Sequence, residues 1–120
     1  MKLFKNSKFL LVGLARDCSD NLSASVFALR NAFAGSAETS FFVLESDSTD
    51  QTPKTLHQLS RSDPNFNYRC VGNLTADFPN RTQRIAHCRN LCLSEIANNN
   101  YFASYDYIVI ADFDDVNHSL

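Results

Sequence analysis

The sequence predicts an α/β fold, Rossmann-like, in which helices cover both faces of a mostly parallel sheet. Apolar runs of strand length alternate with amphipathic helices, and no repeat, low-complexity tract or linker interrupts them. Strands joined through helices make right-handed crossovers, and the resulting parallel sheets are buried on both faces. We therefore expect a single three-layer domain over residues 1–120, with its four strands in the order 3-2-1-4.

The first strand and helix are the clearest elements. Residues 8–15 form a continuous apolar run, typical of a fully buried strand. We expect a helix behind a cap at Ser19 or Asp20. Its apolar residues recur at i, i+4, i+7 and i+11, namely Leu22, Val26, Leu29 and Phe33.

Two more strands and a helix follow. Residues 40–44 form a second apolar strand, and residues 67–71 a weaker third one. Between them Thr52 and Pro53 open a helix that carries Leu56 and Leu59, because proline is favoured at the first helical position.

The last helix and strand complete the pattern. Asn80 to Gln83 resembles a capping box, which predicts a helix from there to about Asn98. Its core stripe would be Ile85, Cys88, Cys92 and Ile96. Residues 105–111 then form a final apolar strand on the edge of the sheet, where it could pair with a second copy of the chain.

Composition limits the function classes. The net charge of −2, from 11 basic and 13 acidic residues, argues against a nucleic-acid partner. The lysines before the first apolar run imitate a signal peptide, but that run is only strand length and no cleavage site follows. No segment could cross a membrane, so we expect a cytoplasmic or peripheral protein. Four Asn-x-Ser/Thr sequons leave a secretory lumen open.

The four cysteines point to buried free thiols, since no Cys-x-x-Cys pair is present for zinc. Several common active-site motifs are also missing. The first strand is not followed by Gly-x-Gly-x-x-Gly, and neither a Gly-x-x-x-x-Gly-Lys phosphate loop nor a Gly-x-Ser-x-Gly elbow occurs. Dinucleotide-dependent oxidoreduction and triad hydrolysis are thereby disfavoured.

Polar residues instead follow the first two strands, at the sheet edge where α/β folds bind ligands. Ala15 ends the first strand and Arg16 follows it, and an acidic segment from Glu45 to Asp50 follows the second. An acid at that second position suits ribose hydroxyls or the donors of a base, so we favour a nucleoside contact for Glu45. For Asp47 and Asp50 a ligand role and an ordinary turn with a helix cap remain equally open.

Arginines gather on the last helix. Arg81 and Arg89 fall on or beside its apolar stripe, and Arg81 and Arg84 lie in its first turn, where the helix dipole disfavours cations. A bound diphosphate would account for both observations. The alternative is a set of salt bridges to the many aspartates.

The last strand runs directly into Asp112, Asp114 and Asp115. Asp112 and Asp114 are two residues apart, so on an extended backbone they project to the same side and could share a hard divalent cation.

Together these segments resemble the GT-A glycosyltransferases, similar to family-two-like and mannosyltransferase-like members. The resemblance lies in ESDSTDQT at 45–52, RIAHCRN at 84–90 and YDYIVIADFD at 105–114, and it spans residues 9 to 117. It implies a nucleotide-sugar donor, with Mn²⁺ or Mg²⁺ held by Asp114 and Asp112, Glu45 at the nucleoside, and an unspecified glycan, lipid or protein acceptor. Asp112 would also contact the donor.

GT-A domains continue well past the Asp-x-Asp signature. The resemblance therefore implies that these residues are the N-terminal, nucleotide-binding half of such a domain, incomplete for transfer. Residues 108–116 also fit the opening of haloacid-dehalogenase-like phosphatases, with Asp112 as nucleophile and Asp114 as acid/base. A non-catalytic nucleotide-binding module is the third alternative.

Overall fold

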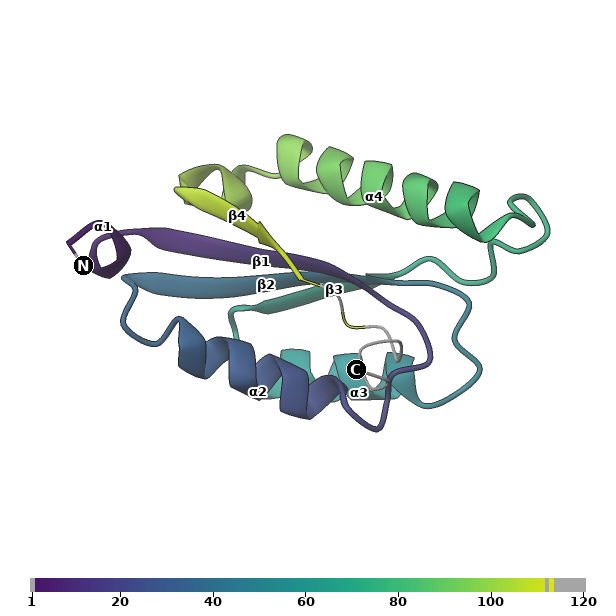
Figure 1. Cartoon of the computed structure of the whole chain (residues 1–120), viewed down its shortest axis with the longest axis horizontal. Helices are drawn as coiled ribbons and strands as arrows, with labels where there is room; N and C mark the ends of the chain where they lie inside the picture. Colours follow the sequence, from purple (N-terminus) through teal and green to yellow (C-terminus); the bar gives the residue numbers. More distant parts are fainter. Residues whose placement is uncertain (1, 112, 114–120) are drawn as a thin grey trace.

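The computed structural model describes residues 2–111 and 113, and it shows a parallel sheet between two helical layers (Figure 1). The strands are β1 (Lys8–Ala15), β2 (Glu38–Glu45), β3 (Phe66–Cys70) and β4 (Tyr107–Ile110). They lie in the order β3-β2-β1-β4 with every pairing parallel. The predicted fold class and strand order are both confirmed.

Helices cover the two faces of this sheet. The helices α2 (Leu22–Ala32) and α3 (Thr52–Ser62) lie on one face, whereas α4 (Arg81–Asn98) and the 3₁₀ turn η1 (Asn100–Ser104) lie on the other (Figure 1). A short helix α1 (Lys2–Lys5) precedes β1. None of the helices in the described part of the chain is both long and apolar enough to cross a bilayer.

The core divides into two clusters because alternate residues of a strand face opposite sides. Leu11 and Phe41 pack with Val26 and Leu56 below the sheet. Above the sheet, the side chains that pack together are Leu10, Val12, Phe42, Leu44, Cys88, Cys92 and Phe102. The predicted stripe on α4 is thus buried at both of its cysteines, and Ile96 packs against the same cluster.

Helix starts match the sequence prediction at α4 but not at α2. Asn80 caps α4, because its side-chain oxygen accepts from the N–H groups of Thr82 (2.8 Å) and Gln83 (3.4 Å). The cap predicted for α2 at Ser19 or Asp20 is wrong, since the helix begins at Leu22 without a side-chain cap.

The chain after β4 remains attached to β1. The N–H of Ala111 donates to the Val12 carbonyl at 2.8 Å, and that of Phe113 to the Leu14 carbonyl at 3.3 Å. The Phe113 ring is buried against Gly13, where an added Cβ would lie 2.4 Å from the ring. A side chain at position 13 would collide with Ala111 and Phe113, so this position requires glycine.

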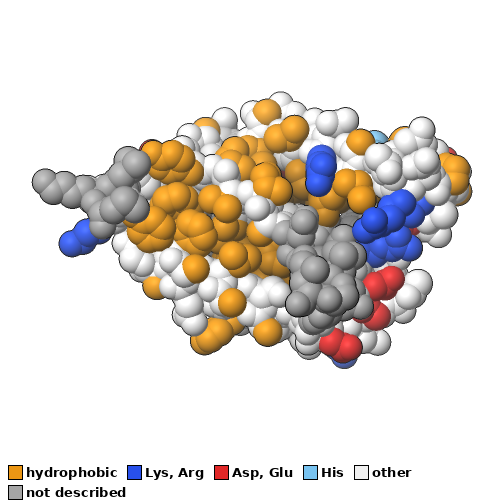
Figure 2. Space-filling model, viewed as in Figure 1, with side chains coloured by type: hydrophobic (Ala, Val, Ile, Leu, Met, Phe, Trp, Pro, Cys, Tyr) orange, Lys and Arg blue, Asp and Glu red, His pale blue; other side chains and the backbone are white. Residues whose placement is uncertain are grey.

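Strand β4 is an edge of the sheet, and it is shorter than the predicted run of residues 105–111. Ile108 is 48% exposed and Ile110 65% exposed. Both lie on the α4 side of the sheet, since they pair with Leu10 and Val12. Hydrophobic side chains gather in this region of the surface (Figure 2).

Candidate functional site

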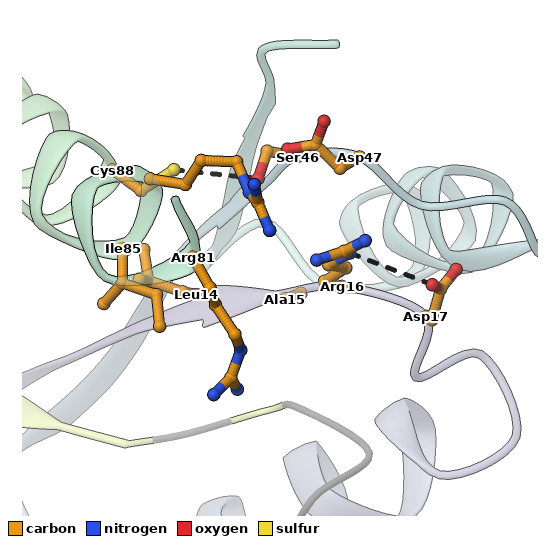
Figure 3. A pocket seen from close by; sticks show the side chains of 10 residues that line it. Leu14, Ala15, Arg16, Asp17, Ser46, Asp47, Arg81, Ile85 and Cys88 are labelled. Atoms are coloured by element: carbon orange, nitrogen blue, oxygen red, sulfur yellow. Dashed lines mark hydrogen bonds and ion pairs between the residues drawn. The ribbon is translucent and has the colours of Figure 1, made fainter. Parts of the chain in front are cut away.

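A small cavity of about 150 Å³ opens at the carboxyl ends of β1 and β2, beside the first turn of α4 (Figure 3). We call it the arginine cavity. Three separate segments supply its wall, which includes Ala15, Arg16, Ser46, Asp47, Arg81 and Arg84. Five predicted site residues thus come together, because parallel strands and the helix that follows them deliver their ends to one edge of the sheet.

The arginines of this cavity are short of acidic partners. Arg84 donates to the backbone carbonyls of Phe78 (2.9 Å) and Pro79 (2.8 Å) rather than to a carboxylate. Arg16 makes one loose contact, 3.9 Å from its Nε to an oxygen of Asp17. Among the described residues, neither Arg81 nor Arg84 forms an ion pair. The salt-bridge alternative raised by the sequence therefore finds no support in this part of the chain.

A second cavity, of about 440 Å³, adjoins the first and shares Arg16 and Asp47 with it. Glu45 lies in its wall, so we call it the Glu45 cavity. The Glu45 side chain is only 3% exposed, and its Oε2 accepts from the Ser48 N–H at 3.0 Å. Partial desolvation of the Cys70 thiol, and next a hydrogen bond to Glu45, raise its pKa to about 11. Cys70 consequently stays a neutral thiol beside the carboxylate.

Asp47 holds the loop that forms the far wall of the Glu45 cavity. Its Oδ1 accepts from the N–H of Leu74 at 2.8 Å and from the N–H and hydroxyl of Thr75 at 3.2 and 3.0 Å. Burial would raise the pKa of Asp47, but hydrogen bonds from Leu74, Thr75 and Ser46 outweigh burial and lower it. The carboxylate therefore stays ionised as a structural anchor.

The loops after β1 and β2 bind each other reciprocally. Asp17 accepts from the Thr49 N–H at 2.6 Å, and Asp50 accepts from the Ser19 N–H and hydroxyl at 3.1 and 2.9 Å. Asp50 also accepts from the Thr52 N–H at 2.9 Å. For Asp50 this is the turn-and-cap role that the sequence left open.

Two of these loop residues have strained backbones. Asp17 has a φ of +48° and Asp47 a φ of +58°, in the left-handed region that non-glycine residues seldom occupy. Such strain persists only where the surroundings impose it, and it is concentrated at ligand sites. Here the cross-loop hydrogen bonds impose it on both sides of the two cavities.

Arg89 is not brought to the arginine cavity. It borders a separate apolar groove of about 290 Å³ between α4 and the strands β1 and β4. At a rise of 1.5 Å per residue, the separation of eight positions between Arg81 and Arg89 places them about 12 Å apart along the helix axis. Their common face of the helix therefore does not by itself bring Arg81 and Arg89 to a single diphosphate.

The predicted metal ligands Asp112 and Asp114 lie outside the described residues. Phe113, the residue between them, is described, and its N–H donates to Leu14 one residue before Ala15. No group of three metal-ligating side chains occurs within residues 2–111 and 113.

Part of the wall of the Glu45 cavity was not predicted from the sequence. Gly72 and Thr75, which follow β3, line the Glu45 cavity. The rule that singled out the ends of the first two strands applies equally to the third and could have found them. Cys70 is exposed, so the prediction of a buried thiol is wrong at this position. The ring of His87 stacks on that of Phe78, with the ring centroids 4.4 Å apart.

Comparison with known protein families, curated protein sequences and solved structures finds no match for this chain.

Proposed function

We propose that the protein binds a nucleotide-sugar donor, with its diphosphate in the arginine cavity and its nucleoside in the Glu45 cavity, and that it is a glycosyltransferase. The observation that carries the proposal is the adjacency of the two cavities through Arg16 and Asp47. One cavity is cationic and the other contains a buried acid. A nucleoside diphosphate has the same division between an anionic and a hydrogen-bonding part.

The electrostatics of α4 support an anion in the first cavity. Arg81 and Arg84 lie in the first turn of α4, and that turn contains no acidic residue. The unpaired N–H groups of a helix N-terminus carry partial positive charge, so two cations there repel the helix dipole as well as each other. A diphosphate would relieve both repulsions and accept charge-assisted hydrogen bonds from the guanidinium groups.

In the proposed reaction, the bond between the anomeric carbon of the sugar and the diphosphate oxygen breaks. A new bond forms from that carbon to an acceptor hydroxyl, whose proton passes to solvent water, and the nucleoside diphosphate leaves with the bonding electron pair. Mn²⁺ or Mg²⁺, held by Asp112 and Asp114, would neutralise charge on the leaving diphosphate.

The test is a screen of UDP-, GDP- and CMP-sugars with Mn²⁺, read as thermal stabilisation, beside generic phosphatase substrates. Binding to the folded state alone stabilises it by about 2.7 kcal/mol at a hundredfold excess over Kd. We expect stabilisation by a nucleotide-sugar and no phosphate release. Phosphate release would instead favour the phosphatase alternative.

The arginine cavity is tested with Arg81→Ala, which should weaken a nucleoside diphosphate about tenfold or more because hydrogen bonds to charged groups contribute roughly 1.5–3 kcal/mol. The free nucleoside should bind almost unchanged. The matched control is Arg61→Ala, an exposed arginine at the end of α3, which should alter neither affinity. Equal losses for nucleoside and diphosphate would show that Arg81 maintains the structure and does not bind phosphate.

A further inference from the structure

We propose that the Glu45 cavity selects guanine, with the Glu45 carboxylate accepting hydrogen bonds from the N1–H and the exocyclic N2 amino group of that base. Glu45 would then be the specificity-determining residue of the nucleotide site. This inference rests on the proposed function, since it concerns the nucleoside of the same donor.

The burial of Glu45 sets the requirement for donors. Its side chain is 3% exposed, so water hydrates the carboxylate poorly. Within the described part of the chain, Glu45 makes no ion pair, and its contacts are the Ser48 N–H and the Cys70 thiol. An ionised carboxylate can accept about four hydrogen bonds, and a buried one is costly unless they are made. A ligand that presents N–H donors would add hydrogen bonds to this carboxylate.

The position of Glu45 makes its carboxylate a fixed acceptor. Glu45 is the last residue of β2 and is paired with Ala15 on β1 and with Cys70 on β3. The Ser48 N–H holds one of its oxygens. Gly72 is also in the wall of this cavity, and it adds no side chain that would fill the space for a planar base. A preorganised acceptor loses little entropy when the ligand binds.

The bases differ in what they offer to two adjacent acceptor oxygens. Guanine presents two neighbouring donors on its Watson–Crick edge, N1–H and the N2 amino group. Uracil presents a single N–H between two carbonyl oxygens, which a carboxylate repels. Adenine and cytosine each place a ring acceptor next to their amino group. A carboxylate accepts only, so guanine is the one common base that can bind it through two hydrogen bonds.

The experiment compares GDP, IDP, UDP and ADP by titration calorimetry at one fixed Mn²⁺ concentration. IDP differs from GDP only in lacking the N2 amino group. IDP would therefore keep only one of the two hydrogen bonds to Glu45, so GDP should bind on the order of tenfold more tightly than IDP. UDP and ADP should bind more weakly than GDP by at least as much.

The variant Glu45→Gln replaces one acceptor oxygen with an amide donor and should abolish the preference of GDP over IDP. The control Glu95→Gln alters an acid of α4 outside the cavity and should preserve that preference. Should Glu45→Gln fold poorly, the comparison of GDP with IDP on the unaltered protein still decides.

The outcomes separate the two proposals. Tighter binding of GDP than IDP, lost in Glu45→Gln, supports both. Binding of UDP or ADP as tight as GDP overturns the guanine assignment and leaves the nucleotide site intact. No binding by any of the four diphosphates overturns the proposed function, and the guanine assignment with it.

Discussion

Removal of one hydroxyl group, in the variant Tyr105→Phe, should measurably destabilise the fold. The Tyr105 hydroxyl is hydrogen-bonded to the Ser40 hydroxyl and to the Glu38 carboxylate, so it ties the segment before β4 to β2. Ser40 is 0% exposed. In the variant the phenyl ring remains, but the Ser40 hydroxyl is left buried without its partner.

The magnitude follows from that orphaned hydroxyl. Leaving a buried polar group unsatisfied costs about 1–3 kcal/mol. Unfolding entropies near 2.1 cal/mol/K per residue give about 0.25 kcal/mol/K for a chain of this length, so the Tm should fall by about 4–12 °C. Thermal denaturation followed by circular dichroism measures this fall. The control is Tyr68→Phe, whose hydroxyl meets the exposed His57 Nδ1 at 3.0 Å and should matter little. Equal Tm values for the two variants would refute the reasoning.

The same hydroxyl gives a pH dependence with a defined sign. Burial, and next the hydrogen bond to Glu38, raise the pKa of Tyr105 above its ordinary value of 10.0. In the unfolded chain the phenol therefore ionises first. The stability that Tyr105 contributes is complete below about pH 10 and is lost as the pH rises further. Urea unfolding at about pH 8 and about pH 11 should show the stability difference between the protein and Tyr105→Phe shrinking with pH, and a constant difference would contradict the assignment.

Two further substitutions test the sheet. Gly13→Ala should lower the free energy of unfolding by about 1–3 kcal/mol or more, because the new Cβ would lie 2.2 Å from the Ala111 carbonyl oxygen. In the control Gly35→Ala the nearest side-chain atom is 3.6 Å away, so the Tm should change little. Similar Tm values for the two variants would be inconsistent with that packing. The edge of β4 should promote self-association, and Ile110→Lys should reduce it, as measured by sedimentation velocity. The control Phe27→Lys alters a residue of α2 that is 66% exposed. An equal reduction in that control would exclude the β4 edge as the site of association.

The sheet was predictable because its signals are local. Apolar runs of strand length specify buried strands, and the helices between them force parallel pairing. The absence of a Ser19 cap at α2 was not predictable, since Ser19 donates its N–H and its hydroxyl to Asp50, which is distant in the sequence. A side chain that could cap a helix was engaged by another loop, and only the tertiary structure reveals that competition.

The candidate site was predictable to the extent that topology alone places residues. Ala15 and Glu45 end neighbouring parallel strands and are paired, so the proximity of Glu45 to Arg16, the next residue after Ala15, follows from strand order. Arg89 was grouped with Arg81 by its angular position on the helix, which ignores the distance along the axis. The role of Asp47 as the anchor of the loop after β3 could not be predicted from the sequence. Its partners Leu74 and Thr75 are distant in the sequence and are brought to it by the path of the chain between β3 and α4.

The use of the acids at this edge explains why the arginines remain available. Asp17, Asp47 and Asp50 accept from backbone N–H groups and hydroxyls of neighbouring loops, so these carboxylates are bound by neutral dipoles and not by the arginines of the cavity. Those bonds fix the loops but leave Arg81 and Arg84 without acidic partners among the described residues. Positive charge held rigidly beside a helix N-terminus is the condition under which an external anion gains most. An edge rich in aspartate can therefore still be built to receive a diphosphate.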